Sequence, residues 1–213
     1  MSKTGLFVGL TALMCLMPLR ATGSEVAKIV PLLKQGGYVL VIRHGATDDS
    51  QKDVYPFVFG DMTKQRQLSD QGRKVARDMG AAFKTLGISI GQVYSSRLNR
   101  AIETGTLMAT TTQIMPMTAL TDSGAGAASA MANPDGSNTI TGDAIRALVN
   151  RPPTAGTNNL IVTHKTNIAD AFGKGLADVK EAETLVYQPN ASGPPTLLGR
   201  VQAGEWVVQA ARQ

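Results

Sequence analysis

The strongest signal for the fold is a run of five apolar residues that leads directly into an arginine and a histidine: Tyr38-Val39-Leu40-Val41-Ile42-Arg43-His44-Gly45. A continuous apolar run of this length predicts a strand that is buried on both faces of a parallel sheet. A second run, Leu160 to Thr163, leads into His164 in the same way. Ligands of open α/β sheets bind beyond the carboxyl ends of the strands. If these two strands are parallel neighbours, the two histidines of the chain meet at one rim of the sheet.

The segments around these strands alternate between helical and strand patterns. Ser69 is a helix cap, and Val75, Met79 and Phe83 share one face before Gly87 ends the helix. Further helices are predicted from residue 96, over 140–149 and over 167–174, and further strands over 88–94, 114–120, 185–187, 197–201 and 206–208. The last three strands are expected to be antiparallel at an edge. This order predicts an α/β fold: a layered α/β/α domain with a mostly parallel central sheet and helices on both faces.

The amino terminus has the layout of a secretory signal peptide. Lys3 precedes an apolar run from Gly5 to Leu19, and the small residues Ala21 and Gly23 follow. The run has 15 residues, and a membrane span needs about 20, so an uncleaved anchor is the less favoured alternative. We therefore expect a signal peptide over 1–23 and a single catalytic domain over 24–213. The mature protein would be secreted or periplasmic, without stable membrane insertion.

The composition excludes several classes of protein. Of the 213 residues, 43% are hydrophobic and 17% are charged, which is typical of a globular chain rather than a disordered one. The net charge of +5 falls to +3 when the signal segment is removed, too little and too diffuse for nucleic-acid binding. The single cysteine, Cys15, excludes a disulfide framework and thiolate metal clusters. Two histidines cannot form a three-histidine zinc site, and we expect neither a metal nor another cofactor.

Arginines close to the two histidines indicate an anion site. Arg43 precedes His44, and Arg97 and Arg100 follow another predicted strand. Guanidinium groups bind phosphate oxygens in pairs and stay charged, and a helix N-terminus adds backbone donors. With no thiol in the mature chain, a neutral imidazole would attack phosphorus and form a phosphohistidine that water cleaves. The second imidazole, His164, is expected to be protonated and to stabilise the equatorial oxygens.

These residues resemble the histidine phosphatase superfamily, which includes phosphoglycerate mutase-like and acid phosphatase-like proteins. Arg43-His44-Gly45 is similar to the hallmark triplet of the family, and this implies that His44 is the nucleophile and that Arg43 binds the phosphoryl group. The segment 94–104 resembles the second block and implies that Arg100 binds phosphate. Residues 68–73 resemble the usual helix start, and residues 162–167 resemble the block that supplies the second histidine, His164. The resemblance covers residues 37–172 in the order of the family.

The general acid is the least defined part of the resemblance. The acid phosphatase-like branch has an aspartate directly after the second histidine, where this chain has Lys165, which cannot serve. The mutase-like branch uses an acidic residue after the third strand, and this implies Asp122 as proton donor, with a raised pKa. The alternative is that Asp122 only begins a turn. Asp48 and Asp49 are the other candidate donors.

Three further side chains, those of Thr47, Arg97 and Lys165, have two interpretations each. Thr47 either binds phosphate or belongs to a turn, and Arg97 either faces the substrate or is solvated. Lys165 either contacts an acidic substrate or lies on the surface. Glu103 follows Arg100 by three residues and could orient its guanidinium. Ser89 lies in a G-x-S-x-G pattern, but this pattern follows a helix and opens a strand, opposite to a hydrolase nucleophile.

Together these observations predict an exported, metal-independent phosphatase that acts on small phosphomonoesters through a phosphohistidine on His44. The alternatives are a phospholigand-binding protein with little turnover and a mutase-type phosphotransferase. Export disfavours the mutase and also a phosphatase of protein phosphohistidines. The loops 46–66 and 122–138 are expected to line the mouth of the site, and their few aromatic residues predict no strong stacking platform.

Overall fold

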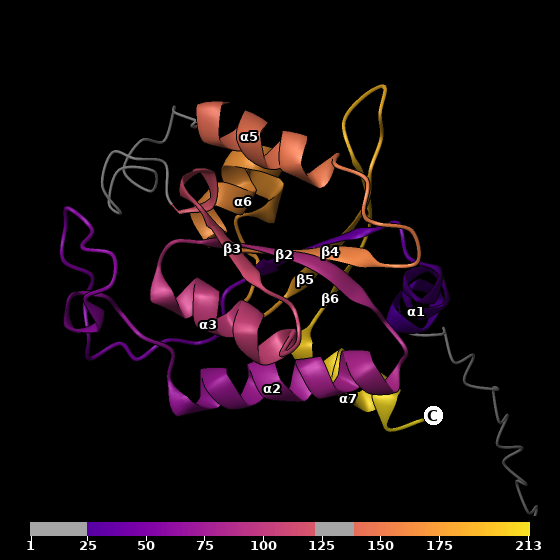
Figure 1. Cartoon of the computed structure of the whole chain (residues 1–213), viewed down its shortest axis with the longest axis horizontal. Helices are drawn as coiled ribbons and strands as arrows, with labels where there is room; N and C mark the ends of the chain where they lie inside the picture. Colours follow the sequence, from indigo (N-terminus) through magenta and orange to yellow (C-terminus); the bar gives the residue numbers. More distant parts are fainter. Residues whose placement is uncertain (1–24, 122–138) are drawn as a thin grey trace, which may run out of the picture.

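The computed structural model describes residues 25–121 and 139–213, so the expected signal peptide and the loop at 122–138, with Asp122, lie outside the described residues. The described chain contains one six-stranded sheet in the order β3-β2-β4-β1-β5-β6 (Figure 1). The strands are β1 (Val39–Arg43), β2 (Ile90–Ser96), β3 (Ile114–Met117), β4 (Asn158–Thr163), β5 (Thr184–Gln188) and β6 (Thr196–Val201). The helices are α1 (Glu25–Gln35), α2 (Asp70–Thr85), α3 (Asn99–Met108), α5 (Thr139–Val149), α6 (Lys165–Phe172) and α7 (Ala203–Ala210).

The sheet is mostly parallel, as predicted. β1 and β2 both pair in parallel with β4, and β3 pairs in parallel with β2. The late strands β5 and β6 pair antiparallel with β1 and with each other, which places them at one edge. The carboxyl ends of the four parallel strands therefore lie at one end of the sheet.

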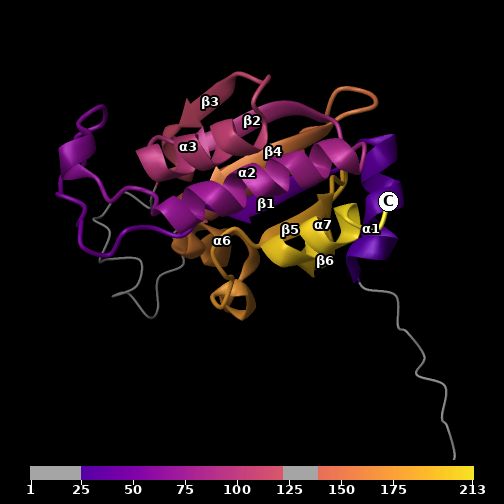
Figure 2. The same cartoon turned by 90° about the horizontal axis from the view of Figure 1, so that it is seen from below.

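Helices cover both faces of the sheet (Figures 1 and 2). Alternate residues of β1 show the two layers: Leu40 and Ile42 belong to a core cluster with α1, α2, α3 and α7, whereas Val39 and Val41 belong to a cluster with α5 and α6. All four side chains are fully buried. The unbroken apolar run is therefore the signature of a strand between two helical layers.

The start of α2 is joined to the turn that follows His44. Ser69 caps the helix as predicted, with its Oγ accepting a hydrogen bond from the Gly72 amide at 3.1 Å. The Ser69 amide donates to the Ala46 carbonyl at 3.0 Å. A side chain at Gly72 would place its Cβ 2.1 Å from the same carbonyl oxygen. Only glycine allows this close approach, which holds the first turn of α2 against the segment after the histidine.

The carboxyl terminus differs from the prediction. Residues 206–208 are part of helix α7 instead of a strand. Trp206 is buried and its Nε1 donates to Thr184 Oγ1 at 3.2 Å, while Val207 and Val208 are exposed. The helix begins with a capping box between Gln202 and Glu205. The capping box and the burial of Trp206 alone among these three residues both indicate a helix. The prediction of a strand followed the β-branched valines, which favour strands.

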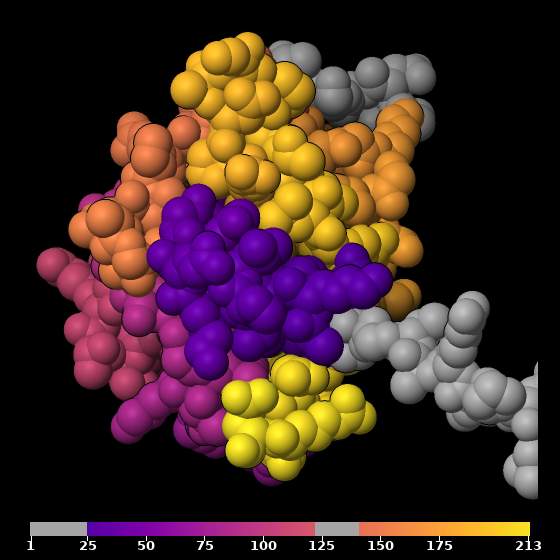
Figure 3. Space-filling model, turned by 90° about the vertical axis from the view of Figure 1, so that its right-hand side faces the viewer, coloured from indigo at the N-terminus to yellow at the C-terminus, as the bar shows by residue number. Residues whose placement is uncertain are grey.

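Helix α1 has no counterpart in the prediction. Its residues Val26, Ile29, Val30 and Leu33 are buried at helical spacing. The helix lies at the end of the sheet opposite the carboxyl ends of the parallel strands, where it contacts β6 and α7 (Figures 1 and 3). It therefore closes the core at the end remote from the histidines.

Smaller differences concern where elements begin and end. β2 continues to Ser96, so α3 begins at Asn99 rather than at Ser96. β3 ends at Met117 and a short 3₁₀ turn, Thr118–Leu120, replaces the rest of the predicted strand. None of the described helices is long and apolar enough to span a bilayer.

Candidate active site

The two histidines meet at the carboxyl ends of β1 and β4. The two strands pair in parallel with Arg43 opposite Thr163, so each histidine is the next residue on its strand. The His44 amide donates to the Thr163 carbonyl at 3.0 Å, and the two ring centroids are 5.2 Å apart. The prediction that the imidazoles share one rim is confirmed.

His44 is held as a neutral ring in one tautomer. The ring is buried and its Nδ1 lies 2.8 Å from the Gly45 carbonyl oxygen. A carbonyl oxygen only accepts hydrogen bonds, so Nδ1 carries the proton and Nε2 has the lone pair. Burial, followed by the positive charge of Arg100, lowers the pKa of His44 to about 3. A neutral imidazole with Nε2 unprotonated is the form that can attack phosphorus.

The turn after His44 is fixed by α3. The Gly45 amide donates to Thr104 Oγ1 at 3.1 Å, and this hydroxyl in turn donates to the Arg100 carbonyl at 2.7 Å. Thr104 is fully buried. The carbonyl that selects the His44 tautomer is therefore anchored to the same helix that carries Arg100.

His164 is paired with a serine that the sequence analysis did not single out. Its Nε2 lies 2.7 Å from Ser96 Oγ, at the end of β2. The Leu98 amide donates to the same Oγ at 3.2 Å, so the hydroxyl can donate its proton to an unprotonated Nε2. No sequence signal marks Ser96, because only the β2–β4 pairing brings it to His164.

The prediction that His164 is protonated is not supported by the groups around its ring. Burial, then the charge of Arg100 and the neighbouring ring of His44, lowers the pKa of His164 well below its ordinary value. The protein groups around His164 thus favour the neutral ring rather than the protonated one. A phosphate dianion beside the ring would raise this pKa, because an opposite charge favours the protonated form.

Three guanidinium groups act on the two imidazoles: those of Arg43, Arg100 and Arg66. Arg43 Nη1 donates to the Val179 carbonyl at 3.0 Å, and its Nη2 donates to Glu181 Oε1 at 3.1 Å. Burial lowers the pKa of Arg43. The Nε groups of Arg43 and Arg66 are buried, and neither has a hydrogen-bond partner among the described residues. Buried N–H groups without a hydrogen-bond partner are suited to binding an anion.

Nothing in the sequence singles out Arg66, which lies two residues before the helix start at 68–73. Its exposure is intermediate, and its Nη1 lies 3.7 Å from Asp49 Oδ1. Its position at the end of a long loop carries no pattern that distinguishes it from a surface arginine. Tertiary structure brings it to the strand ends.

Arg100 is buried and makes an ion pair with Asp53. Its Nη1 lies 2.9 Å from Asp53 Oδ1, and the same oxygen accepts a hydrogen bond from the Arg66 amide at 2.9 Å. Asp53 therefore ties the loop 46–66 to two of the three arginines. The suggested partner of Arg100, Glu103, instead pairs with Arg73 of α2 at 2.7 Å.

The remaining candidates lie around this cluster. Arg97 is exposed and its guanidinium carbon lies 3.9 Å from the centre of the Phe59 ring, so its described contact is with the loop 46–66. Thr47 forms an isolated backbone bridge to Leu68, which fits its turn interpretation. Lys165 is half-buried at the start of α6.

The two other candidate donors are exposed carboxylates. Asp48 accepts hydrogen bonds from the Ser50 hydroxyl at 2.7 Å and from the Ser50 amide at 2.9 Å, and these bonds lower its pKa. The Asp49 side chain is 88% exposed. The lowered pKa of Asp48 is opposite to what a proton donor at neutral pH requires.

The segment that leads to Asp122 lies beside the histidines. Thr163 Oγ1 donates to the Leu120 carbonyl at 2.9 Å, and the Arg97 amide donates to Thr121 Oγ1 at 2.8 Å. The last two described residues before Asp122 are therefore attached to the sheet, Leu120 to the end of β4 and Thr121 to the residue after β2.

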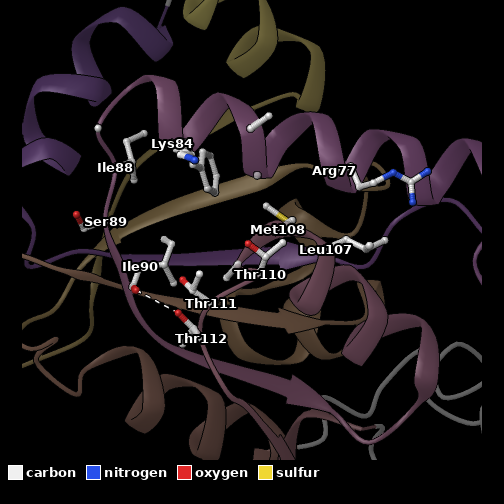
Figure 4. Close-up of a pocket in the computed structure, with 15 residues that line it drawn as sticks. Arg77, Lys84, Ile88, Ser89, Ile90, Leu107, Met108, Thr110, Thr111 and Thr112 are labelled. Atoms are coloured by element: carbon white, nitrogen blue, oxygen red, sulfur yellow. Dashed lines mark hydrogen bonds between the residues drawn. The ribbon is translucent and has the colours of Figure 1, made fainter.

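A cavity of about 620 Å³ lies at another place in the fold (Figure 4). It is lined by α2, by the start of β2 and by the residues after α3, including Arg77, Lys84 and Ser89. Ser89 precedes β2, whereas His164 lies beside Ser96 at the other end of that strand. The geometry therefore excludes Ser89 as the nucleophile of a triad with His164.

Sequence and structure comparisons agree on the relatives of this chain. The sequence model of the histidine phosphatase superfamily (branch 1) matches residues 39–135. The fold is similar to phosphoserine phosphatase from Entamoeba histolytica in complex with 3-phosphoglyceric acid, with 16% identity and a TM-score of 0.54 over 78% of this chain and 96% of that one.

Two other solved structures have the same fold. The protein histidine phosphatase SixA, complexed with tungstate, has 16% identity and a TM-score of 0.53 over 78% of this chain and 97% of that one. YhfR of Bacillus stearothermophilus has 15% identity and a TM-score of 0.57 over 78% and 98%. Comparison with curated protein sequences gives no significant match. Residues 39–135 thus match the histidine phosphatase superfamily in sequence, and the fold of the described chain is similar to that of solved phosphatases.

Proposed function

We propose that the protein is an exported phosphatase that hydrolyses phosphomonoesters through a phosphohistidine on His44, without a metal ion. The observation that carries the proposal is the state of His44: its Nδ1 proton is held by the Gly45 carbonyl, which leaves the Nε2 lone pair for attack. The fold and the family agree with this chemistry.

The reaction has two steps. His44 Nε2 attacks phosphorus, the N–P bond forms and the P–O bond to the alcohol breaks, while Asp122 gives its proton to the leaving oxygen. The Asp122 carboxylate then takes a proton from water, the oxygen of this water attacks phosphorus, and the N–P bond breaks to release phosphate. Microscopic reversibility gives one residue both the acid and the base role.

Guanidinium groups supply the charge that a metal ion provides in other phosphatases. Besides burial, the positive charges of Arg100, Arg43 and Arg66 all lower the pKa of His44. Preorganised donors of this kind stabilise the charge on the equatorial oxygens of the transition state. The His164 ring centroid lies 5.2 Å from that of His44, which supports a contact between His164 and one of these oxygens.

Release of phosphate from phenyl phosphate tests the proposal. We expect the full-length protein to hydrolyse this ester in the presence of EDTA, and the variant His44→Ala to lose about 10³-fold or more in kcat. A phosphoprotein that is labile in acid and stable in alkali should be trapped from the parent alone. If His44→Ala hydrolyses the ester as fast as the parent, the nucleophile is wrong.

Export is tested separately. The amino-terminal sequence of the protein recovered from the producing cell, and the fraction that contains it, should show cleavage after Gly23. An intact Lys3 on protein in the cytosolic fraction would contradict export and leave the chemistry of His44 untouched.

A phospholigand-binding protein with little turnover is the second candidate. It is favoured by one observation: among the described residues, the carboxyl group nearest the arginines, that of Asp53, is ion-paired with Arg100. Calorimetry that detects phosphate binding, combined with no phosphate release from any ester, would favour this function over hydrolysis.

A further inference from the structure

A loop beside the candidate site exposes an unusual number of apolar side chains. We name residues 54–62 the apolar loop. The exposed fractions are 47% for Val54, 57% for Tyr55, 38% for Val58 and 45% for Met62. Seven large apolar residues are exposed in the described part of the chain, and four of them lie in this short segment. Clustered apolar exposure is a mark of a binding surface.

The apolar loop is held in a defined conformation. The Val54 amide donates to the Lys64 carbonyl at 2.9 Å and closes its base. Gln65 is buried; its Nε2 donates to the Val58 carbonyl at 3.0 Å, and its Oε1 accepts a hydrogen bond from the Asn99 amide at 2.9 Å. Asp53, directly before the loop, pairs with Arg100. The loop is therefore attached both to α3 and to the arginine cluster.

A row of contacts connects the apolar loop with the imidazoles. The rings of Tyr55 and Phe57 are 5.7 Å apart and those of Phe57 and Phe59 are 6.2 Å apart. The Arg97 guanidinium lies on the Phe59 ring, and Arg97 is the residue after Ser96, whose hydroxyl contacts His164. The loop stands at the same end of the sheet as the start of α3 in both views (Figures 1 and 2). This aromatic row corrects the expectation that the loops offer no stacking platform.

We propose that the apolar loop and Arg97 form the subsite for the leaving group, and that the substrate is a phosphomonoester of an apolar alcohol. This inference rests on the proposed function, because the phosphoryl group and the alcohol are the two ends of one substrate molecule. The arginine cluster takes the phosphoryl end, and the aliphatic and aromatic side chains take the end that would otherwise expose hydrocarbon to water. A small polar alcohol, such as that of a sugar or an amino acid, would leave these side chains exposed.

Binding of alkylphosphonates tests this assignment without turnover. Methylphosphonate and hexylphosphonate present the same charged head and differ only in hydrocarbon. Each fully buried methylene changes affinity by about fourfold, so partial cover of the hexyl chain should give at least about tenfold tighter binding. Calorimetric titration of the full-length protein with both compounds measures this ratio. Equal affinities would overturn the proposal, whereas failure to hydrolyse phenyl phosphate would count against the proposed function alone.

Matched variants locate the effect. The double variant Val54→Ser with Val58→Ser removes hydrocarbon from the apolar loop, and the double variant Val207→Ser with Val208→Ser does the same on α7, where the two valines are 40% and 53% exposed. We expect the loop variant to lose at least about threefold of the hexyl-to-methyl ratio while its methylphosphonate affinity is unchanged. The α7 variant should keep the parent ratio.

Two results would contradict the assignment. One is an unchanged ratio in the loop variant, which would place the alkyl chain elsewhere. The other is a parent protein that sediments as a dimer and becomes a monomer in the loop variant, because the apolar loop would then be covered by a second copy of the chain. A parent that sediments as a monomer, with the ratio lost in the loop variant, supports the proposal.

Discussion

The carboxyl ends of the parallel strands and the antiparallel carboxyl-terminal segment contribute to the site in different ways. The strand ends supply the groups that can react, His44 and His164, which are buried and neutral. The segment 178–201 supplies support: Val179 and Glu181 accept hydrogen bonds from Arg43. In this site the reacting groups are positioned by strand register, whereas the charged Arg43 is positioned by acceptors from a separate part of the chain.

The support is itself stabilised by a buried carboxylate. The Glu183 side chain is fully buried, accepts from Arg200 Nε at 2.6 Å and accepts from the Lys180 amide at 2.7 Å. Arg200 also pairs with Asp178 at 3.0 Å. These contacts fix the turn that carries Glu181, at a distance from the reacting atoms.

The largest difference between the two regions is expected in kcat. His164→Ala should lower kcat for phenyl phosphate by about 10² to 10³-fold, because it removes a group that faces the reacting phosphoryl. Arg200→Met should lower kcat by less than about threefold, because Arg200 acts only through the support. Steady-state kinetics of both variants measures this contrast, and similar losses would remove the distinction between the regions.

Stability should depend on pH over two ranges that overlap below about pH 4.5. His44 and His164 have lowered pKa values, so the unfolded chain binds their protons first and stability is lost as the pH falls below about 6.5, down to the folded pKa, which is about 3 for His44. The expected slope is about 1.4 kcal/mol per pH unit for each histidine.

The effect of Glu183 begins at a lower pH than that of the histidines. Burial raises its pKa, but the hydrogen bonds from Arg200 and the Lys180 amide outweigh burial and leave the pKa below its ordinary value of 4.5. Its contribution is present above about pH 4.5 and is lost as the pH falls below that value. Urea unfolding from pH 7 to pH 4 should show a shallower slope for the double variant His44→Asn with His164→Asn, and an unchanged slope above pH 5 for Glu183→Gln. The reverse pattern would contradict the pKa directions.

Asp53→Asn should change the affinity for phosphate by a few-fold. The variant keeps an acceptor oxygen for Arg100 and removes the negative charge that opposes an anion, so inorganic phosphate should inhibit at a concentration about three to ten times lower. The inhibition constant measures this effect. Asp61→Asn is the control, because Asp61 accepts from Thr63 and pairs with Lys64 away from the arginines. Weaker inhibition by phosphate would show that the charge of Asp53 positions Arg100 rather than competing with the ligand.

The smallest effect is expected for Glu181→Gln. The ion pair with Arg43 is partly exposed, with 40% of the Glu181 side chain accessible, and such pairs contribute about 1 kcal/mol or less. KM should rise by up to about threefold with kcat unchanged. A large fall in kcat would show that Glu181 belongs with the reacting groups.

Much of the fold could be predicted because its signals are local. The apolar run before His44, the cap at Ser69 and the paired late strands β5 and β6 all follow from neighbouring residues. The failure at the carboxyl terminus has a local cause as well. The β-branched pair Val207 and Val208 favoured a strand, although the capping box of Gln202 and Glu205 begins a helix that buries Trp206.

The candidate site could be predicted only in part. Its histidines and Arg100 carry recognisable patterns, whereas Ser96, Arg66 and Asp53 carry none and reach the site through pairing across the sheet and through the loop 46–66. The role of Asp122 and the signal peptide stay predictions, because both lie outside the described residues.

From the sequence it follows that each of two strands ends in an imidazole, because an apolar run and the residue after it are covalently adjacent. The parallel pairing of β1 with β4, which brings the two rings to one rim, belongs to the tertiary structure. Tertiary structure alone decided their charge and tautomer. Burial and the nearby guanidinium groups lower the pKa of both rings, and a single carbonyl oxygen 2.8 Å away assigns the proton of His44. The loop 46–66 was predicted to line the mouth of the site, and the tertiary structure adds how its apolar residues are attached there, with the Arg97 guanidinium 3.9 Å from the centre of the Phe59 ring. Electrostatic and desolvation effects depend on distances through space, which the order of residues does not specify.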